Sequence, residues 1–254
     1  MTIALIDGDI IAYRCSASIE PNKSTKPERE PLDLAILRAD ELLYRIIGSV
    51  QSTEHRIFIS GGSNFRKTLY PGYKANRDKL IRPVALESVR EFLVREWGAE
   101  VCAGYEADDG IGIAATADSV ICSIDKDLRQ IPGEHFNFVK DEFETVDPYS
   151  AALAFWTQML VGDASDNVPG ISGIGPVKAA RALVGLSPEE MEATTRNLYG
   201  DPEWFSLNWR LLKVIRSEEE WNEIEATIRK SEGEEPTEDG SSSNPNSIPD
   251  TNKE

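Results

Sequence analysis

Four short apolar runs in the first half of the chain constrain its fold more than any other feature of the sequence. The runs occupy residues 3–6, 56–59, 100–103 and 120–124. The segments between them that carry a helical pattern are residues 34–47, 84–97 and 107–117. Strands that alternate with helices along a chain form a mostly parallel sheet. We therefore predict an α/β fold, a parallel sheet with helices on both faces.

Strand-like runs stop at Pro148, and the remaining sequence has helical patterns. These patterns cover residues 149–161, 177–184, 188–198, 203–215 and 217–230. We predict an α/β domain over residues 1–147, an all-helical part over residues 148–230 and a tail over residues 231–254. The tail holds seven acidic residues and one lysine among Ser, Pro and Asn, a composition that is typical of disorder.

The cysteines and the N-terminus indicate a compartment. The three cysteines form no CxxC or Cys/His spacing, so we expect buried thiols in a reducing environment and no zinc site. The chain starts without a basic leader, and no run approaches the roughly 20 apolar residues of a membrane span. These features predict a soluble protein in the cytoplasm.

Acidic residues follow three of the four predicted strands. They are Asp7 and Asp9 after the first strand, Glu106, Asp108 and Asp109 after the third, and Asp125 and Asp127 after the fourth. The carboxyl ends of parallel strands meet at one edge of the sheet, where ligands bind. We expect these groups to converge there, and Asp163 and Asp166 further along the chain bring the cluster to nine carboxylates.

So many carboxylates in one place repel one another and raise each other's pKa values. Divalent cations relieve that repulsion, and oxygen ligands without His or Cys favour Mg²⁺ or Mn²⁺. A pair of such ions about 4 Å apart suits the hydrolysis of a phosphodiester. Taken singly, each group has an ordinary alternative as a turn, a helix N-terminus or a capped loop. Taken together, they favour a metal site.

Residues 162–183, GDASDNVPGISGIGPVKAARAL, join this acidic cluster to a glycine-rich turn. Gly170, Gly173 and Gly175 allow backbone amides to approach an anion closely, and Pro176 is typical of a first helical turn. With Lys178 in that turn, the segment predicts a clamp on the DNA backbone. The alternative is an ordinary glycine-rich loop between two helices.

The net charge of −17 argues against a nucleic-acid partner, but its distribution is uneven. Residues 66–82 hold six Arg or Lys against one Asp. A cation near bound metals can bind the scissile phosphate, and an aromatic ring can stack on an unpaired base. The candidates are Lys74 and Arg77 for the phosphate, Tyr73 for the base, and Arg66, Lys67 and Lys79 for peripheral phosphates. A solvated basic loop is the alternative.

Five motifs in this order, IDGD, FRKTLYPGYKANRDK, EADD, SIDKD and GDASDNVPGISGIG, resemble the 5′→3′ exonuclease and flap endonuclease family. Its members include the 5′-nuclease domain of bacterial DNA polymerase I and stand-alone bacteriophage exonucleases, and this short chain is more similar to the stand-alone phage or small bacterial enzymes. The resemblance implies a monomer in the cytoplasm of a bacterial or phage-infected cell. The resemblance spans about residues 3–185. It implies a PIN-like (resolvase-like) domain with a helical arch near residues 64–97, and a helix-three-turn-helix, a form of helix-hairpin-helix, over residues 162–184 that binds duplex DNA.

The resemblance also implies roles for the site residues. One metal ion is held by Asp7, Glu106, Asp108 and Asp125; Asp127, Asp163 and Asp166 serve the second ion directly or through waters; and Asp109 belongs with them. Lys74 contacts the scissile phosphate, Arg77 lies beside it, and both act as catalytic residues together with Asp7 and Asp125. The implied cofactors are two Mg²⁺ ions, which Mn²⁺ can replace, and K⁺ bound by carbonyls of the hairpin.

The function that these features favour is metal-dependent hydrolysis of DNA at 5′ ends, flaps or junctions, including RNA–DNA hybrids, in replication, repair or primer removal. A PIN-type ribonuclease is one alternative, although it gives no reason for the glycine-rich hairpin. One departure from the family leaves another alternative open. Many relatives carry an Asp after the second strand, where this chain has Ser60, Gly61 and Gly62. A protein that binds DNA junctions without cutting them would fit that gap.

Overall fold

The computed structural model describes residues 2–22, 26 and 28–232, and the chain divides into two units, residues 1–218 and residues 219–254. The first unit therefore includes both the predicted α/β domain and most of the predicted helical part. The second unit contains nearly all of helix α10 (Glu218–Glu232). The predicted disorder of the tail concerns residues that, apart from the end of α10, lie outside the described part of the chain.

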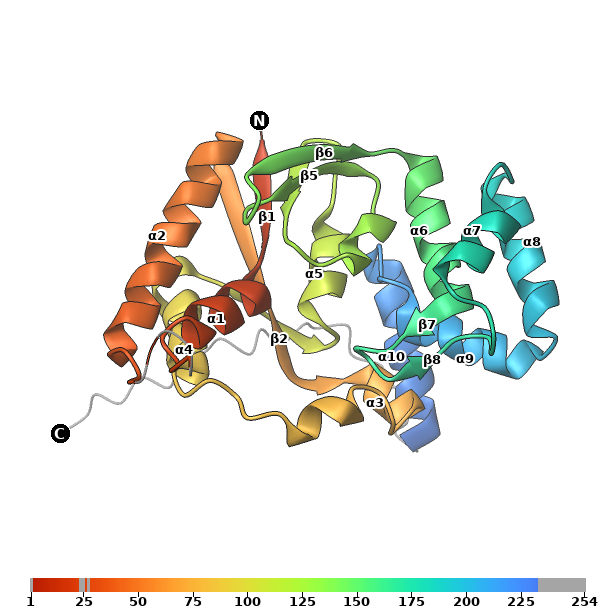
Figure 1. The fold of residues 1–254 in the computed structure, drawn as a ribbon, viewed down its shortest axis with the longest axis horizontal. Helices are drawn as coiled ribbons and strands as arrows, with labels where there is room; N and C mark the ends of the chain where they lie inside the picture. The colour runs from red at the N-terminus through yellow and green to blue at the C-terminus, as the bar shows by residue number, and fades with distance from the viewer. Residues whose placement is uncertain (1, 23–25, 27, 233–254) are drawn as a thin grey trace. The chain divides into compact units, whose positions relative to one another are not determined.

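A six-stranded sheet with the order β3-β2-β1-β4-β5-β6 forms the centre of the first unit (Figure 1). The strands are β1 (Ile3–Asp7), β2 (Glu54–Asn64), β3 (Glu100–Gly104), β4 (Ser119–Cys122), β5 (Gly133–Asn137) and β6 (Glu142–Val146). All neighbouring strands run parallel except β5 and β6. The α/β prediction is confirmed. The sequence patterns missed β5 and β6, because most side chains of β6 are exposed and leave no apolar run.

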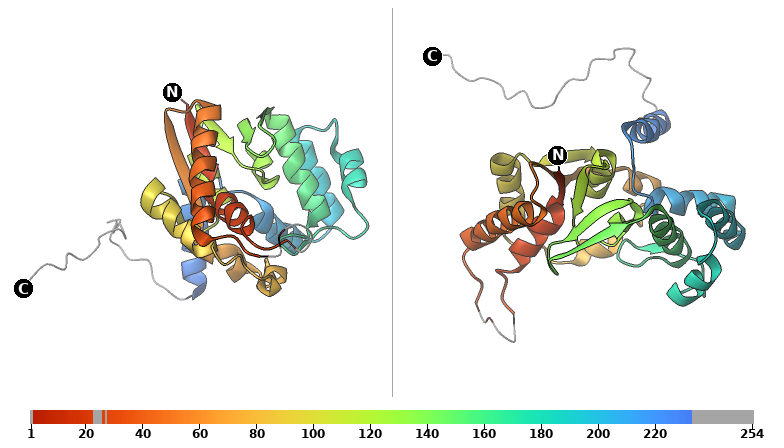
Figure 2. Two further views of the ribbon diagram at one scale, coloured as in Figure 1. Left: turned by 60° about the vertical axis from the view of Figure 1, so that its left-hand side comes forward. Right: turned by 90° about the horizontal axis from the view of Figure 1, so that it is seen from above.

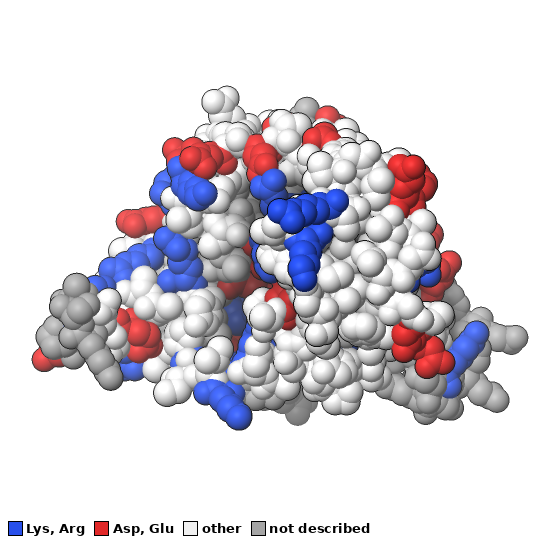
Figure 3. Space-filling view, turned by 45° about the vertical axis from the view of Figure 1, so that its right-hand side comes forward, with Lys and Arg blue, Asp and Glu red and all other residues white. Residues whose placement is uncertain are grey.

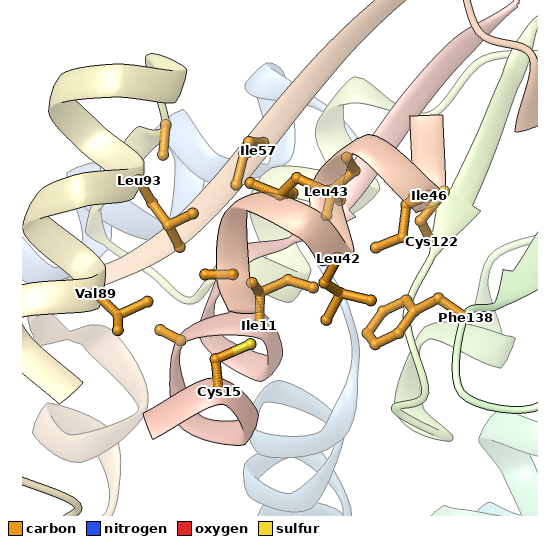
Figure 4. Close-up of a cluster of buried hydrophobic side chains, with 14 of the residues drawn as sticks. Ile11, Cys15, Leu42, Leu43, Ile46, Ile57, Val89, Leu93, Cys122 and Phe138 are labelled. Atoms are coloured by element: carbon orange, nitrogen blue, oxygen red, sulfur yellow. The ribbon is translucent and has the colours of Figure 1, made fainter. Parts of the chain in front are cut away.

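Helices cover both faces of the sheet. Successive side chains of β1 point to opposite faces and are buried on both. Ala4 and Ile6 point toward α1 (Gly8–Ala17), α2 (Leu32–Val50) and α4 (Leu86–Trp97), where they join the large core cluster whose side chains Figure 4 shows. Leu5 points to the other face and packs in the cluster that includes Ile111 of α5 (Ala107–Ala114). Within the described residues, no helix is long and apolar enough to cross a membrane.

The chain after residue 147 is mostly helical, with α6 (Pro148–Val161), α7 (Pro176–Leu183), α8 (Pro188–Tyr199) and α9 (Pro202–Leu212). Asp147, Ser187 and Asp201 cap three of these helices, and each precedes a proline at the first helical position. Figure 2 shows α7 and α8 well apart from α1 and α2.

The expectation that strands stop at residue 148 is wrong in one place. A short antiparallel pair, β7 (Gly162–Asp163) and β8 (Val168–Pro169), follows α6. The two backbone segments approach so closely that a Cβ atom on Gly162 would lie 2.2 Å from the Gly170 nitrogen. The predicted helix over residues 203–215 also ends early, at Leu212, and residues 213–215 continue without helical structure.

The segment predicted as an arch, residues 64–97, contains α3 (Phe65–Leu69), the 3₁₀ helix η1 (Ala75–Lys79) and α4, joined by irregular chain. Asn64 caps α3 by accepting a hydrogen bond from the Arg66 N–H. Lys74 has a left-handed backbone with φ of 56° and starts η1. That turn brings the basic residues toward the carboxyl ends of β1, β3 and β4.

Candidate active site

A cavity of about 460 Å³ lies at the carboxyl ends of the central strands. Seven carboxylates line it, namely Asp7, Asp9, Glu106, Asp108, Asp125, Asp127 and Asp166. Three cations also line it: Lys74, Arg77 and Lys126. Figure 3 shows one hollowed face of the molecule, with acidic side chains deep in the hollow and basic side chains along its borders. The structure thus brings together most of the acids that the sequence places after strands.

Hydrogen bonds at the ends of β1 and β4 orient Asp7 and Asp125. Asp7 is the last residue of β1 and the N-cap of α1, where it accepts a hydrogen bond from the Ile10 N–H at 3.0 Å. The Ser123 hydroxyl donates to its other oxygen at 2.8 Å and also accepts from the Asp125 N–H at 3.0 Å. Ser123, which sequence reasoning missed, therefore fixes the two aspartates relative to each other.

Burial and mutual repulsion make the metal-free cavity electrostatically unfavourable. Burial raises the pKa of Asp7 to about 7, and Asp9 and Asp125 add repulsion. Burial also raises the pKa of Asp127 to about 7, with added repulsion from Asp125 and Asp163. The pKa of Asp108 is well above its usual value for the same two reasons. Such a cluster gains stability from any bound cation.

The donor set fits hard divalent cations, because the cavity is lined by carboxylate oxygens and contains neither His nor Cys. In the described part of the chain, no three acidic, His or Cys side chains are placed so that they could hold an ion as they stand. Instead, basic side chains lie against some of these acids. Binding of a cation therefore requires that some of these ion pairs rearrange.

Lys74 and Arg77 reach into the cavity from the basic segment. The Lys74 ammonium donates to Glu106 and lies 3.6 Å from Asp166, and the Arg77 guanidinium donates to Asp166 at 2.5 Å. Burial alone would raise the pKa of Glu106, but Lys74 and Arg66 outweigh it and hold the pKa below its usual value. These contacts place both cations against carboxylates of the cavity, and their role toward a phosphate stays a prediction.

The predicted stacking role of Tyr73 does not fit its position. Its side chain is buried, only 2% exposed, in a cluster with Trp156 and Leu160. Its hydroxyl lies 2.8 Å from Glu106 Oε2 and 3.0 Å from Asp166 Oδ2. The ring is therefore inaccessible to a base in this structure, and the hydroxyl links two acids. A basic neighbourhood in the sequence does not reveal that one of its aromatics points inward.

Two further expectations, Asp109 as a metal ligand and Arg66 as a phosphate contact, are also corrected. Asp109 is fully buried, and its oxygens accept bonds from both terminal nitrogens of Arg66 and from the N–H groups of Glu106 and Ile215. A carboxylate has about four lone-pair sites, so these four hydrogen bonds leave none for a metal ion. Arg66 is buried as well and donates to the carbonyls of Leu211 and Lys213. Arg66 and Asp109 therefore bind each other and nearby backbone groups, and not a phosphate or a metal ion.

Asp163 lies beside the cavity and not in its lining. It is buried and accepts hydrogen bonds from Lys126 at 2.8 Å, Gln158 at 3.0 Å and the Ser165 N–H at 2.8 Å. Burial would raise its pKa, but Lys126 and Ser165 lower it to about 2. Asp163 is therefore anionic in the structure, and its role toward a metal stays a prediction.

The glycine-rich hairpin precedes α7. Gly173 has φ of 77°, in the left-handed region, and its carbonyl accepts a hydrogen bond from Lys178 at 2.7 Å. Gly175 is exposed and is the N-cap residue of α7. Gly170 has a packing role, since a Cβ there would lie 2.1 Å from the Val161 carbonyl carbon. Lys67, Lys79 and Lys178 are exposed and accessible to a ligand.

Ser60 follows the second predicted strand, where no carboxylate stands, but lies within β2 of the structure and is linked to Asp9. The Ser60 N–H donates to Asp9 at 3.0 Å, and the Ser60 hydroxyl accepts from the Ala107 N–H at 2.9 Å. Arg90 of α4 donates to Asp9 as well. Asp9 thus lines the cavity with a guanidinium partner, a contact that no spacing in the sequence indicates.

Comparison with known proteins agrees with this fold. Residues 2–155 match the family model described as the 5′-3′ exonuclease, N-terminal resolvase-like domain. Among curated proteins, DNA polymerase I of Deinococcus radiodurans is 31% identical over 200 residues, which are 72% of this chain and 20% of that protein. The flap endonuclease Xni of a Shewanella species is 29% identical over 198 residues, 70% of this chain and 72% of Xni.

Solved structures show the same fold at low sequence identity. A bacteriophage T5 flap endonuclease complex with DNA and metal ions has a TM-score of 0.61 and 17% identity, covering 91% of this chain and 98% of the other. The T5 5′-exonuclease with bound zinc has a TM-score of 0.59 and 17% identity, covering 91% and 99%. This chain belongs to the 5′-3′ exonuclease family. It spans about a fifth of the length of the DNA polymerase I relatives that it matches.

Proposed function

We propose that this chain is a metal-dependent 5′→3′ exonuclease and flap endonuclease that hydrolyses phosphodiester bonds of DNA. The observation that carries the proposal is the convergence of seven carboxylates in one cavity with Lys74 and Arg77 among them. Membership of the 5′-3′ exonuclease family supports the same reaction. A T5 relative of the same fold has been crystallised with DNA and metal ions, which supports both the substrate class and the cofactor class.

The carboxylates would hold two divalent cations, Mg²⁺ or in its place Mn²⁺. We assign Asp7, Glu106, Asp108 and Asp125 to one ion. Asp127 and Asp166 serve the other, with Asp163 behind them. When bound, such ions activate the attacking water and stabilise the leaving oxygen. Asp7 and Asp125 are the acids of the first group that Ser123 ties together.

Lys74 and Arg77 would bind the oxygens of the scissile phosphate. Both cations already lie against carboxylates. A phosphate can therefore take the place of a carboxylate as their anionic partner at little additional cost in desolvation. Positive charge at this point stabilises the charge that develops on the phosphate during hydrolysis. Arg77 is the more exposed of the two.

The DNA would extend from the cavity across the basic segment and the hairpin. Lys67 and Lys79 are available for backbone phosphates, and the amides around Gly173 and Gly175 with Lys178 form a second contact, with K⁺ bound by hairpin carbonyls. The substrates would be 5′ ends, flaps and junctions, including RNA–DNA hybrids, met by a monomer in the cytoplasm during replication or repair. Gly173 already offers its carbonyl to one cation, Lys178.

A cleavage assay tests the proposal. We would incubate a 5′-labelled flap, a blunt duplex and a single-stranded RNA of matched length with the protein in Mg²⁺ or EDTA, and resolve the product lengths on a gel. The proposal expects Mg²⁺-dependent release of mononucleotides or short 5′ fragments from DNA. Cleavage of the RNA alone would indicate a PIN-type ribonuclease. Retained flap binding without cleavage would indicate a protein that recognises junctions only.

A further inference from the structure

The five residues Leu211–Ile215, here called the 211–215 segment, are bound by side chains that support the candidate active site. This segment includes the end of α9 and the chain that follows it. Arg66 donates to the Leu211 and Lys213 carbonyls at 3.0 and 2.7 Å. Gln130 donates to the Leu212 carbonyl at 2.8 Å and accepts from the Val214 N–H at 3.2 Å. Each residue from 211 to 214 therefore contributes one backbone group to a buried side chain.

The first connection runs from the segment to Glu106. Asp109 accepts the Ile215 N–H at 3.0 Å, forms a two-bond pair with Arg66, and accepts the Glu106 N–H at 3.0 Å. Glu106 is the N-cap of α5, so this bond fixes where its carboxylate enters the cavity. The backbone approach is close, because a Cβ on Gly112 would lie 2.2 Å from the Ile215 carbonyl oxygen.

The second connection runs through two glutamines to Asp127 and Asp163. The Gln130 amide nitrogen donates to Gln158 Oε1 at 2.9 Å. The Gln158 amide nitrogen then donates to Asp127 at 2.9 Å and to Asp163 at 3.0 Å. An amide nitrogen has two hydrogens, so both donations can form together, and the bond from Gln130 to the oxygen sets the orientation of the amide.

We infer that the 211–215 segment positions both groups of metal-binding carboxylates, with Arg66, Gln130 and Gln158 as positioning residues. The inference rests on the proposed function, because it concerns the metal ligands assigned there. It adds a part of the chain that lies beyond the matched residues 2–155. Partners behind metal ligands orient them, and their loss typically weakens metal affinity by about 10- to 100-fold.

Gln130 gives the sharpest test, because its bonds reach the 211–215 segment and Gln158 without contacting a carboxylate. We would compare the wild type, Gln130→Met and Gln158→Met by calorimetric titration of Mn²⁺ into the DNA-free protein, and by single-turnover cleavage of a 5′ flap. Methionine keeps the length of the side chain and removes its hydrogen bonds.

We expect Gln158→Met to lower Mn²⁺ affinity by about 10-fold or more, and Gln130→Met by roughly 3- to 10-fold. The maximal cleavage rate should fall in both variants while the half-saturating DNA concentration stays unchanged, because neither glutamine is among the proposed DNA contacts. Lost packing alone would not weaken metal binding selectively. Should Gln130→Met fail to fold, Gln130→Asn takes its place, since it keeps an uncharged amide but is too short to bond both the 211–215 segment and Gln158.

The matched control is Ile46→Val, which trims a buried side chain in the core cluster on the other face of the sheet. Thermal unfolding of every variant shows how much stability each has lost, and Ile46→Val should leave Mn²⁺ affinity unchanged. Wild-type Mn²⁺ affinity in Gln130→Met would overturn the inference, even if Gln158→Met binds weakly. A wild type that neither binds Mn²⁺ nor cleaves DNA would instead refute the proposed function.

Discussion

Replacing Asp127 by asparagine should stabilise the metal-free protein. Burial and neighbouring carboxylates raise the pKa of Asp127 from 3.8 to about 7 in the folded state. A group whose folded pKa is raised binds its proton more tightly in the folded than in the unfolded state. The free energy of unfolding therefore falls as the pH rises from about 4 to about 7. Asparagine removes this penalty and can still accept the Gln158 hydrogen bond on its oxygen.

The rise in the pKa of Asp127 from 3.8 to about 7 corresponds to an upper bound of about 4 kcal/mol on the free energy of unfolding above pH 7. Because the acids titrate together and the variant loses its attraction to Lys126, we expect a gain of about 1–3 kcal/mol at pH 8. The gain should be smaller at pH 5.5. Urea unfolding of the wild type and Asp127→Asn in EDTA at the two pH values measures it.

Added Mg²⁺ should stabilise the wild type more than Asp127→Asn, because a ligand that binds only the folded state raises its stability. The variant should also cleave DNA more slowly. A variant that is no more stable than the wild type at pH 8, or whose gain is equal at both pH values, would contradict the electrostatic account of the cavity.

Three more predictions concern single side chains. Arg66→Met should destabilise the protein by about 3–5 kcal/mol in urea unfolding, because it leaves Asp109 buried without its partner, and the double variant with Asp109→Leu should recover part of the loss. Tyr73→Phe should slow single-turnover cleavage with unchanged DNA affinity, because it removes only the hydroxyl that links Glu106 and Asp166; an unchanged cleavage rate would contradict a role for that hydroxyl. Lys178→Ala should weaken duplex binding and reduce the slope of log affinity against log salt by about 1, and an unchanged slope would remove the hairpin from the interface.

The convergence of the acids that follow strands could be predicted, because a parallel sheet brings the carboxyl ends of its strands to one edge. Asp7 ends a buried strand and Asp125 follows another, and Asp108 follows β3, an edge strand that is mostly exposed but still ends at the same side of the sheet. The carboxyl ends of neighbouring parallel strands meet whichever side chains the strands carry. The central strands have two buried faces, so their apolar runs are clear in the sequence. Strand β6 was not predicted, because most of its residues are exposed and it has no apolar run in the sequence.

The misassigned residues have partners far away in the sequence. Arg66 stands in a basic stretch and Asp109 in an acidic one, so local charge suggested a phosphate contact and a metal ligand. Their pairing across 43 positions, and the Leu211 carbonyl 145 positions beyond Arg66, can be seen only in the folded chain. Gln130 and Gln158 gave no signal at all, because an isolated glutamine carries neither charge nor periodicity.

The most direct test of the account is the single-turnover rate of 5′ flap cleavage by the wild type and Asp125→Asn across a Mg²⁺ titration, with Arg56→Lys as a control. Arg56 forms a two-bond pair with Glu100 outside the cavity. We predict no cleavage in EDTA, a rate that rises steeply with Mg²⁺ for the wild type and Arg56→Lys, and a rate at least about 100-fold lower for Asp125→Asn. Equal rates for Asp125→Asn and the wild type, or cleavage that persists in EDTA, would contradict a metal-dependent site at these carboxylates.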